Sequence, residues 1–495
     1  MKIKPCLPVF LKLKLCLQLL MPQFGLTSAA AFSLLKCMNQ PFHARSFQIS
    51  RRSFLSRCAL AAAATGLPLW FIERNSAFAA DVATSAPGLP GPNDRPGVAL
   101  IGCGGQGMFD ALNASGYGDI LAVCDVNQEP LEAAVQKFTK DGKSPDKYTD
   151  FRKVLERDDI HIIVQATPDH WHTLVNIAAA NVKKDIYGEK PLTLTVDEGK
   201  HIIKAVRKNK IVFQTGTQQR SDRRFRLACE LVRNGRLGKL QEVNVWVPGG
   251  LREGPFQTGQ VPPPTLNFDF WLGQAPQVEY LQERCDNTFR WWWDYAGGPV
   301  TDWGAHHNDI ARWGIGQDGP VSVEASVITG PIPGGFTTPS EFSATLTWAN
   351  DIRQTVKTTL DDGPFGQVLK ADGQRNGIKF IGTDGWIWVN RDEITASKTE
   401  LLTAPLPDNA IQLEVSHNHM RNFFDCVLSR KDPVASVENG HRSAVIGHLI
   451  GIALRTCQKF GWDPKAEIFT GPDAKVGNQQ LAREMRKPYN YHFAG

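Results

Sequence analysis

The sequence predicts an α/β protein: an N-terminal doubly wound parallel sheet, followed by a C-terminal α+β domain with an open, largely antiparallel mixed sheet. Three observations lead to this prediction. Short apolar runs alternate with helical patterns over residues 97–217, and a glycine-rich turn follows the first of these runs. Beyond residue 218, strand-like runs follow one another without regular helices between them. We therefore expect two folded domains.

The leader, residues 1–79, has the features of a twin-arginine export signal. Residues 50–55 read Ser-Arg-Arg-Ser-Phe-Leu, residues 58–72 are uncharged, and Ala77-Phe78-Ala79 matches an A-x-A cleavage site. Because such signals lie near the true amino terminus, Met38 is a candidate start. We expect the twin-arginine translocation machinery to export the folded protein to the periplasm. Residues 80–96, rich in Pro, Gly, Ala and Ser, are expected to form a linker.

Two apolar segments of the leader raise the question of a membrane span. Residues 58–72 are fewer than the roughly 20 apolar residues that a bilayer requires, and they include Gly66 and Pro68. Residues 15–35 are uncharged and long enough, although Pro22 and several polar side chains dilute them. We interpret the longer segment as lying upstream of the true start rather than as an anchor, and we expect no stable span in the mature form.

The composition argues against a nucleic-acid partner. The chain has 55 Lys and Arg against 50 Asp and Glu, but the leader holds ten of the basic side chains and one of the acids. The remainder has 45 basic and 49 acidic side chains, a net charge of about −4, and therefore lacks a positive field for phosphates. Of the ten cysteines, the six beyond the leader show no C-x-x-C spacing, which fits neither a zinc site nor a disulfide framework.

The first domain is assigned to residues 97–217. Its alternation of short apolar runs and helical patterns predicts βαβ units, and hence a parallel sheet with helices on both faces. The expected strands are Val98–Ile101, Asp119–Cys124, His161–Ala166, Asp185–Tyr187 and Ile211–Thr215.

The glycine-rich turn joins the first expected strand to a helix. Gly102-Cys103-Gly104-Gly105-Gln106-Gly107 has the pattern G-x-G-x-x-G. In such a loop Gly102 permits the tight turn, Gly104 lets a pyrophosphate approach the backbone, and Gly107 lets helix and strand pack closely. The helix amino terminus, with Gly105 and Gln106, offers N–H groups to the phosphates. In this context the pattern predicts a Rossmann domain that binds a dinucleotide.

Asp125 decides which dinucleotide is expected. It ends the second expected strand, downstream of the glycine loop, where a carboxylate accepts hydrogen bonds from the adenosine ribose hydroxyls. A phosphate on that ribose would face a like charge, which at ~4 Å and an effective dielectric of ~20 costs roughly 4 kcal/mol. Val126 and Asn127 supply no compensating cation. The sequence therefore predicts NAD rather than NADP.

Two further segments follow expected strands and so lie at the carboxyl edge of the sheet, where ligands bind. They are Thr167-Pro168-Asp169-His170-Trp171-His172 and Glu189-Lys190-Pro191. The histidines can also be explained as surface residues at the start of a helix, and Lys190 as a solvated charge. The position beside the nicotinamide favours a role in binding and chemistry, and the candidates for cofactor contact are Thr167, Pro168, His170, His172, Glu189 and Lys190.

These motifs resemble those of the Gfo/Idh/MocA oxidoreductases, the family of glucose–fructose oxidoreductase and inositol dehydrogenase. The resemblance extends to Gly297–Asp309, which reads GGPVTDWGAHHND, and to Trp462-Asp463-Pro464-Lys465, and so spans nearly the whole mature chain. It implies a Rossmann domain followed by an open mixed sheet that covers the nicotinamide, with substrate held between them. It also implies a cis bond between Lys190 and Pro191, and catalytic roles for Lys190, Asp302 and His306.

The second domain is assigned to residues 218–410. Its expected strands mix apolar and polar residues, which fits a sheet with one covered face; they are Glu242–Val247, Val321–Ile328, Ser343–Trp348, Gln354–Thr359 and Lys379–Gly382. Helical patterns return at residues 417–428 and 438–460. The resemblance implies that the helices and tail of residues 411–495 pack back on the Rossmann domain.

Asp302 and His306 are four positions apart, so a helix over Thr301–Trp313 would place both on one face. A carboxylate beside an imidazole fixes its tautomer and raises its basicity, which suits removal of a hydroxyl proton near neutral pH. Two other interpretations stay open: an ordinary structural His–Asp pair, and a metal site that adds His307 and Asp309. We expect no metal, because hydride transfer from an alcohol requires none when NAD and a base are present.

The segment Arg290-Trp291-Trp292-Trp293-Asp294-Tyr295 has the most unusual composition of the chain. Clustered aromatic side chains usually belong to a core, yet flat rings flanked by charges also suit a sugar. Both interpretations stay open. The candidates for substrate contact are Gln219, Arg220, Arg290, Trp291, Trp292 and His307.

The sequence therefore predicts an exported NAD-dependent oxidoreductase that acts on a carbohydrate or polyol and holds its cofactor tightly. Two alternatives remain: a redox-neutral hydrolase or lyase that uses transient sugar oxidation, and a non-catalytic protein that binds carbohydrate or nucleotide. Family members commonly associate through the open sheet, so a homo-oligomer is expected. The sequence does not identify the sugar or the carbon that is oxidised.

Overall fold

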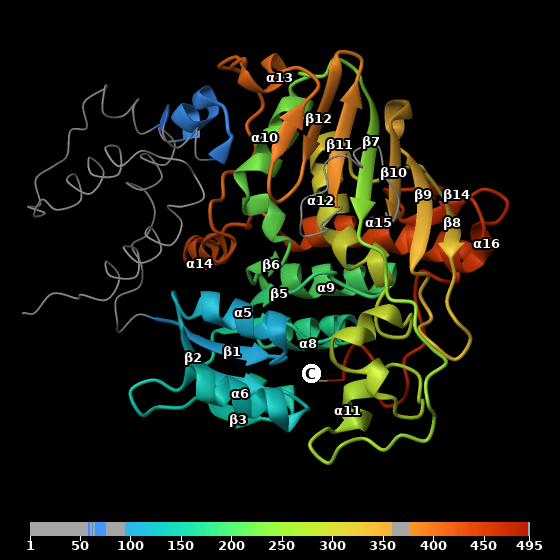
Figure 1. Ribbon diagram of the computed structural model, residues 1–495. Helices are drawn as coiled ribbons and strands as arrows, with labels where there is room; N and C mark the ends of the chain where they lie inside the picture. The colour runs from blue at the N-terminus through green and yellow to red at the C-terminus, as the bar shows by residue number, and fades with distance from the viewer. Residues whose placement is uncertain (1–57, 60–61, 63–64, 76–94, 359–375, 494–495) are drawn as a thin grey trace, which may run out of the picture. The chain divides into compact units, whose positions relative to one another are not determined.

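The computed structural model describes residues 58–59, 62, 65–75, 95–358 and 376–493 (Figure 1). The twin-arginine motif, the A-x-A site, residues 15–35 and most of the expected linker lie outside the described residues. Within the described part of the chain, no helix has both the length and the apolar character needed to cross a membrane.

The first sheet has six parallel strands in the order β3-β2-β1-β4-β5-β6. The strands are β1 (Gly97–Ile101), β2 (Asp119–Cys124), β3 (Asp146–Tyr148), β4 (Ile162–Gln165), β5 (Asp185–Gly188) and β6 (Phe213–Thr215). This order confirms the predicted doubly wound sheet, whose direction of winding reverses between β1 and β4. The sequence did not predict β3, because Asp-Lys-Tyr lacks an apolar run.

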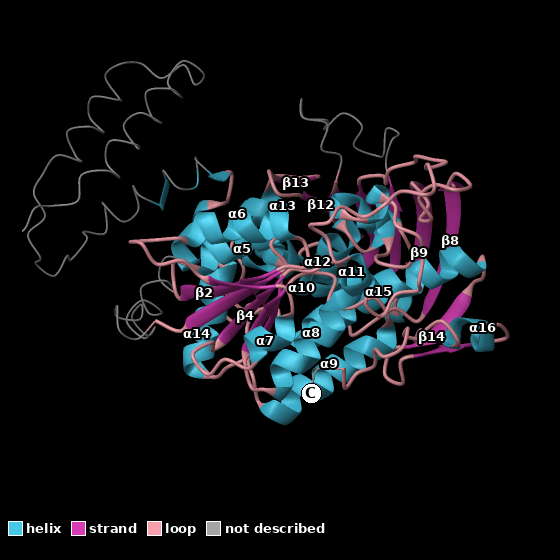
Figure 2. Ribbon diagram, turned by 90° about the horizontal axis from the view of Figure 1, so that it is seen from below, coloured by secondary structure: helices cyan, strands magenta, loops and turns pink. Residues whose placement is uncertain are grey.

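Helices cover both faces of this sheet, as Figure 2 shows. Their bounds are α5 (Gly105–Ala114), α6 (Gln128–Phe138), α7 (Phe151–Leu155), α8 (Asp169–Asn181) and α9 (Val196–Asn209). Buried side chains of α7, α8 and α9 pack in one apolar cluster, and those of α5 and α6 pack in a second. The two clusters lie on opposite faces of the strands, because successive side chains of a strand point to opposite sides.

The second sheet is mixed and has nine strands in the order β13-β12-β11-β7-β10-β9-β8-β14-β15. Only the β10–β7 pair among them is parallel in the described part of the chain. The strands are β7 (Leu240–Val247), β8 (Ser322–Thr329), β9 (Glu341–Thr347), β10 (Arg353–Thr358), β11 (Gly377–Gly382), β12 (Gly385–Val389), β13 (Ile394–Ala396), β14 (Phe460–Asp463) and β15 (Ile468–Thr470). The predicted open mixed sheet is confirmed.

One face of this sheet is covered by α10 (Arg223–Arg233), α12 (Trp303–Ile315) and α15 (Val437–Thr456) (Figure 1). Along β9 and β10, buried side chains alternate with less buried ones, as expected for a sheet with one covered face. Further helices in the described part of the chain are α11 (Phe268–Leu272), α13 (Glu400–Thr403), α14 (His419–Ser429) and α16 (Ala474–Asn478).

The carboxyl-terminal part departs from the expectation in one respect. The helix expected over residues 438–460 ends at Thr456, where Cys457 takes a left-handed conformation. Phe460 begins β14, whose side chains alternate between buried and half-buried, and β14 and β15 extend the second sheet. The tail therefore serves both domains, because Tyr489 and Phe493 pack near Trp171 of the first domain.

A short helix over residues 69–75, which belongs to the expected leader, packs on α10. Phe71 and Ile72 are buried, and the guanidinium carbon of Arg226 lies 4.7 Å from the centroid of the Phe71 ring. The indole of Trp70 donates a hydrogen bond to the carbonyl oxygen of Leu402 at 2.9 Å. Cleavage after Ala79 would therefore uncover part of α10.

The long helix α15 holds the two domains together. It contacts α9 on one side and α12 and β8 on the other. A methyl group built on Gly199 of α9 would lie 2.0 Å from Nδ1 of His441 on α15. The His441 ring is fixed from its other side by Glu467, whose carboxylate lies 2.7 Å from Nε2. The close approach of the two helices therefore requires glycine at position 199.

We expect Gly199→Ala to destabilise the protein by about 1–3 kcal/mol, because the added methyl group forces α9 and α15 apart. Urea unfolding would show this as a lower midpoint. Gly116→Ala is the matched control, since its nearest neighbour, the carbonyl oxygen of Asn113, would lie 3.4 Å from the new methyl group. Equal midpoints for the two variants would contradict this account of the domain contact.

Candidate active site

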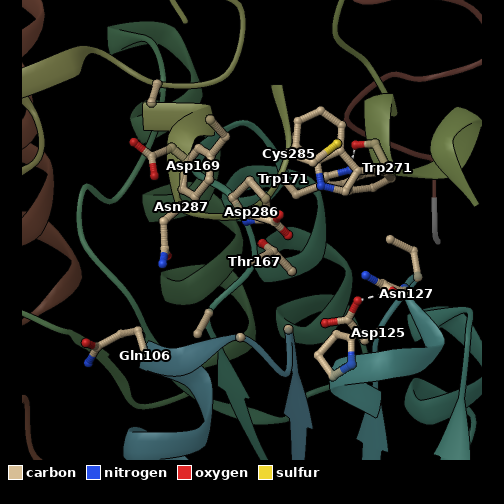
Figure 3. A pocket seen from close by; sticks show the side chains of 18 of the residues that line it. Gln106, Asp125, Asn127, Thr167, Asp169, Trp171, Trp271, Cys285, Asp286 and Asn287 are labelled. Carbon is tan, nitrogen blue, oxygen red and sulfur yellow. Dashed lines mark hydrogen bonds between the residues drawn. The ribbon is translucent and has the colours of Figure 1, made fainter. Parts of the chain in front are cut away.

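A cavity of about 1170 Å³ lies at the carboxyl edge of the first sheet. The ends of β1, β2, β4 and β5 contribute to its lining, and so does the segment from Gln260 to Asp302 of the second domain. Figure 3 shows side chains of both parts facing the same space, with Asp125 and Asn127 across from Cys285 and Asp286. The site therefore lies where the sequence placed it, between the two domains.

The glycine loop has the geometry that a dinucleotide requires. Gly102 has a φ of +91°, and a methyl group there would lie 2.6 Å from the Ala166 backbone. At Gly107 it would lie 2.0 Å from the Gly102 carbonyl oxygen. At Gly104 and Gly105, in contrast, it would meet no atom within 4 Å. Gly102 and Gly107 thus close the turn, while Gly104, Gly105 and the start of α5 leave room for a pyrophosphate.

Asp125 lies at the end of β2, and its carboxylate is held by two backbone N–H groups. Cys103 and Asn127 each donate a hydrogen bond to it at 2.8 Å. Burial raises the pKa of Asp125, and these N–H donors oppose that rise. Asp125 lines the cavity, and neither Val126 nor Asn127 adds a cation. The geometry suits a ribose with free hydroxyl groups, as in NAD.

A strap from the second domain, residues 260–287, covers this part of the cavity. Its backbone pairs with the chain just after Asp125: the Gln128 N–H donates to the Thr265 carbonyl at 2.9 Å, and the Asn267 N–H donates to the Val126 carbonyl at 3.0 Å. Several strap side chains line the cavity, among them Leu266 and Tyr280. Sequence reasoning missed the strap, because pairing between segments so far apart in the chain leaves no local pattern.

Lys190 and Asp302 meet at the inner end of the cavity. The Nζ of Lys190 lies 2.7 Å from Oδ1 of Asp302, and Nε of Arg290 lies 3.5 Å from the same oxygen. Burial acts to raise the pKa of Asp302, but Lys190 and Arg290 outweigh burial and hold it below its ordinary value. The carboxylate is therefore ionised. The peptide bond between Lys190 and Pro191 is cis, as the family resemblance implied.

Asp302 does not orient His306 as the sequence predicted. It is the residue before the first turn of α12, and its carboxylate faces Lys190 and Arg290. His306 is buried, and its Nδ1 has no hydrogen-bond partner among the described residues. Burial, followed by Lys190, holds the pKa of His306 well below its ordinary value. The imidazole is therefore neutral, its unpartnered Nδ1 is buried, and His306 is not among the residues that line the cavity.

Gln219, predicted to lie near substrate, lies next to His306. In the amide orientation that satisfies both neighbours, it donates to the His306 carbonyl oxygen at 3.2 Å and accepts from Nε of Arg391 at 3.2 Å. The Arg391 guanidinium lies 4.5 Å from the centroid of the Trp303 ring. Sequence reasoning missed Arg391, because it follows β12 in a part of the chain where no strand was expected.

Glu189 is one of a pair of buried carboxyl groups. Its Oε1 accepts from Nε2 of Gln218 at 2.8 Å and from Nε2 of Gln106 at 3.4 Å, and the same Gln106 nitrogen donates to Asp110 at 3.1 Å. Burial raises the pKa of both Glu189 and Asp110. Gln106 and Glu189 line the cavity, whereas Asp110 lies behind them. No sequence pattern pointed to Asp110, because only the fold brings α5 beside the end of β5.

The two predicted histidines of the first domain support the cavity wall. His170 is fully buried, its Nε2 lies 2.9 Å from the Trp271 carbonyl oxygen, and it is not part of the lining. Nδ1 and Nε2 of His172 lie 2.6 and 2.9 Å from the Pro191 and Thr167 carbonyl oxygens, and a neutral ring donates to one of the two. Burial lowers the pKa of His170 to about 3 and that of His172 to about 4, so both are neutral.

The other residues of that segment reach the cavity. Thr167, Pro168, Asp169 and His172 contribute to its lining. Burial raises the pKa of Asp169 to about 7, and Lys190 acts against this rise. Asp169 therefore changes charge close to neutral pH beside the Lys190–Asp302 pair.

Three predicted substrate residues have structural surroundings instead. Arg220 forms a buried ion pair with Asp309 at 2.6 Å. Trp292 lies in an apolar cluster and donates from its indole to the Glu283 carbonyl at 2.7 Å. His307 has no exposed surface, because α12 is buried from Gly304 to Ile315. Within the aromatic segment, Trp292 therefore belongs to the core. Arg290 lines the cavity, and Trp291 is partly buried against the cluster.

The described residues contain no group of three or more His, Cys, Asp or Glu side chains placed to hold a metal ion. His307 and Asp309, the additional ligands of the alternative metal site, are buried residues of α12, and Asp309 is engaged by Arg220.

Comparisons with known proteins agree with this geometry. Residues 97–217 match the NAD-binding Rossmann-fold model of the Gfo/Idh/MocA oxidoreductases, and residues 246–491 match the C-terminal α/β domain model of the same family. The chain belongs to the Gfo/Idh/MocA oxidoreductase family. Its first domain is therefore the NAD-binding domain, and the predicted fold class and cofactor are confirmed.

The curated relatives match part of this chain. The myo-inositol 2-dehydrogenase of Thermotoga maritima is 24% identical over 223 residues, which are 45% of this chain and 55% of that protein. A glycosyl hydrolase family 109 protein of Shewanella baltica is 31% identical over 210 residues, which are 39% of this chain and 44% of that protein. The chain thus spans about half the length of the curated relatives it matches.

Solved structures share the fold over both domains. The WlbA dehydrogenase from Bordetella pertussis, in complex with NADH and UDP-GlcNAcA, has a TM-score of 0.55 and 19% identity over 74% of this chain and 99% of that one. A levoglucosan dehydrogenase, in complex with NADH and levoglucosan, has a TM-score of 0.53 and 20% identity over 74% and 98% of the two chains. At these identities the likeness concerns the fold.

We expect Asp125→Asn to weaken NAD binding and to reduce the discrimination against NADP, because the substitution removes the charge that repels a ribose phosphate. Titrations of NAD and NADP against the cofactor-free protein would show the two dissociation constants moving toward each other. Asp119→Asn, at the exposed start of the same strand, is the matched control and should leave their ratio unchanged. An unaltered ratio in Asp125→Asn would exclude this role.

Proposed function

We propose that this chain is an NAD-dependent oxidoreductase that transfers a hydride between a CH–OH carbon of a carbohydrate or polyol and a tightly held nicotinamide. The observation that carries the proposal is the meeting of Lys190, which follows β5 of the NAD-binding domain, with Asp302 in a cavity built by the glycine loop and Asp125. The neutral, buried His306 lies one helical turn beyond Asp302. The names of the inositol and levoglucosan dehydrogenases support this class of substrate.

The side chains divide the work of alcohol oxidation. Bound NAD supplies the hydride acceptor. Asp302 fixes the Lys190 ammonium group at 2.7 Å, so that its other N–H groups can donate to the substrate oxygen and stabilise negative charge there. We assign acceptance of the hydroxyl proton to the neutral imidazole of His306, which lies one helical turn beyond Asp302 and just behind the cavity lining. Arg290 keeps Asp302 ionised and thereby keeps Lys190 in place.

The strap accounts for retention of the cofactor. Its backbone bonds to residues 126–128 place residues 260–287 over the cavity beside Asp125. Release of the nucleotide requires these bonds to break or the cofactor to pass under the strap. Slow exchange follows, and with it a need to reoxidise or reduce the nicotinamide in place.

The amino-terminal features support export as part of the same proposal. A twin-arginine signal at residues 50–55 fits a protein that folds around its cofactor before translocation to the periplasm. A cofactor retained by the strap removes the need for a pool of free NAD outside the cytoplasm. We further propose a homo-oligomer formed through the face of the second sheet opposite α10, α12 and α15.

A second candidate outcome uses the same site without net oxidation. Oxidation of a sugar carbon can activate a glycosidic bond for cleavage, after which the hydride returns to the product. The likeness to glycosyl hydrolase family 109 proteins favours this possibility. Analysis of products by mass spectrometry separates the two outcomes, because one changes the oxidation state of the sugar and the other breaks a bond.

We expect Lys190→Ala and His306→Ala to lower turnover of sugar substrates by about 10²–10⁴-fold while NAD stays bound, because they remove the polarising cation and the base. Single-turnover reduction of the bound nicotinamide, followed by its absorbance, measures the effect. Lys137→Ala and His492→Ala, both on the surface and remote from the cavity lining, are the matched controls. Wild-type rates in both active-site variants would refute the proposed roles.

We expect Leu266→Ala to speed NAD dissociation by about tenfold, because it removes apolar contact, worth about 1–2 kcal/mol, between the strap and the cavity. A chase with excess unlabelled NAD after loading with labelled NAD measures the rate. Thr258→Ala, an exposed change just before the strap, should leave the rate unaltered. Identical dissociation rates in all three proteins would remove the strap from the account of retention.

A further inference from the structure

A second cavity, of about 240 Å³, opens at the ends of α10 and α12 beside the first turn of α15. It shares no lining residue with the nucleotide cavity. Arg220, Arg233 and Arg312 come together in its wall from three separate places in the chain. Its volume corresponds to roughly eight water molecules at about 30 Å³ each, so it can hold a small ion together with part of its hydration shell.

The three guanidinium groups differ in how they are compensated. Arg220 is fully engaged, because Nε and Nη2 donate to the two oxygens of Asp309 at 2.6 and 2.7 Å and Nη1 donates to the Val434 carbonyl at 3.2 Å. Arg220 therefore needs no further partner. It also pairs with Asp309, the carboxylate that lies closest in sequence to Arg312.

Arg312 is buried without an ion pair among the described residues. Only 7% of its surface is exposed. Its Nη2 donates to the Asn439 side chain at 2.7 Å, and its Nε has no partner. Asp309, one turn earlier in α12, is held by Arg220 and by Ser443 at 2.5 Å. Burial lowers the pKa of Arg312 to about 10, and Arg220 adds to this effect, so the group stays charged at neutral pH.

Arg233, the last residue of α10, is likewise without an ion pair in the described part of the chain. Its Nη1 donates to the Trp313 carbonyl at 3.4 Å. It packs against Gly316, where an added methyl group would lie 2.6 Å from its Nε. The position of this guanidinium is thus fixed by the glycine that ends α12, and the group faces the same cavity as Arg312.

The carboxylates around the cavity act on these charges without pairing with them: Asp309 and Asp318 oppose the fall in the pKa of Arg312 that burial causes. Asp318 is 69% exposed at the rim and pairs with Arg442 at 3.3 Å. Burial raises the pKa of Glu414, and Arg220 is the cation that acts on it. Neither carboxylate forms an ion pair with Arg233 or Arg312 among the described residues. Guanidinium groups have five donors each and match the oxygens of phosphate in a bidentate geometry.

We propose that this cavity binds a small phosphate-type oxyanion between Arg233 and Arg312. The anion accepts from donors that the protein leaves unused and neutralises a guanidinium that is otherwise buried unpaired. Its binding joins the last turns of α10 and α12 to the first turn of α15. Because α12 also carries His306 in its first turn, an occupied cavity fixes the far end of the helix that carries this residue.

The test is calorimetric titration of inorganic phosphate into the NAD-loaded protein at constant ionic strength, so that the nucleotide cavity is filled. We expect saturable binding, and about tenfold or greater weakening in Arg233→Gln and in Arg312→Gln, since each removes charge-assisted hydrogen bonds. Arg207→Gln is the matched control, because Arg207 is an exposed arginine that pairs with Asp432 and Glu438. It should bind phosphate as the wild type does.

Two further measurements keep the outcome clear. If Arg312→Gln fails to fold, Arg233→Gln still decides the question, because Arg233 is only half-buried. Titration of glucose 1-phosphate beside inorganic phosphate distinguishes a phosphoryl group of a metabolite from the free ion, and tighter binding of either supports the site. Absence of saturable phosphate binding in the wild type, or unchanged affinity in Arg233→Gln, would overturn the proposal.

Discussion

The ion pair between Lys190 and Asp302 is the interaction on which the site depends. Its partners are 112 residues apart and belong to different domains, yet Nζ and Oδ1 lie 2.7 Å apart. The pair can form only when the second domain is docked at the carboxyl edge of the first sheet. That docking relies on α15, which contacts α9 of one domain and α12 of the other. The pair is partly buried, with 14% and 21% of the two side chains exposed, and docking and site geometry support each other.

Burial then shifts the pKa values of neighbouring titratable groups in different directions. Asp302 stays ionised because Lys190 and Arg290 outweigh its burial, whereas Asp110 and Glu189 have raised pKa values because burial dominates. His306 is kept neutral by burial and by the nearby Lys190. This separation of pKa values suits three distinct roles: Asp302 as a fixed anion, Lys190 as a fixed cation and His306 as a free base. Asp302 and Asp110 are the same type of side chain, yet their pKa values shift in opposite directions.

The sequence predicted those parts of the fold that have a local period, and it failed where tertiary contact decides. The strand Asp119–Cys124 was predicted with its observed bounds, since it is a continuous apolar run before a turn. The glycine loop was predicted because its residues are adjacent in the chain. Asp302 and His306 were placed on one helix by their spacing, but the N-terminal position of Asp302 turns its carboxylate to Lys190. Asp110, Arg391 and the strap depend on distant segments, which no local pattern encodes.

Under the proposed function, a retained cofactor changes what the acid–base groups must do. With the strap over the adenosine end, the hydride taken from one substrate must be returned to a second substrate or to a product before the next cycle. The proton removed from the hydroxyl must then be returned at the same place.

A base with an ordinary pKa in open solvent would exchange that proton freely. His306, buried and without a partner at Nδ1 among the described residues, can hold the proton only while the substrate oxygen is beside it. The pKa of His306 is depressed most strongly by burial and next by Lys190, so the protonated form is short-lived and the returning proton is readily given up. The same burial that makes His306 a base in one half of the cycle makes it an acid in the other.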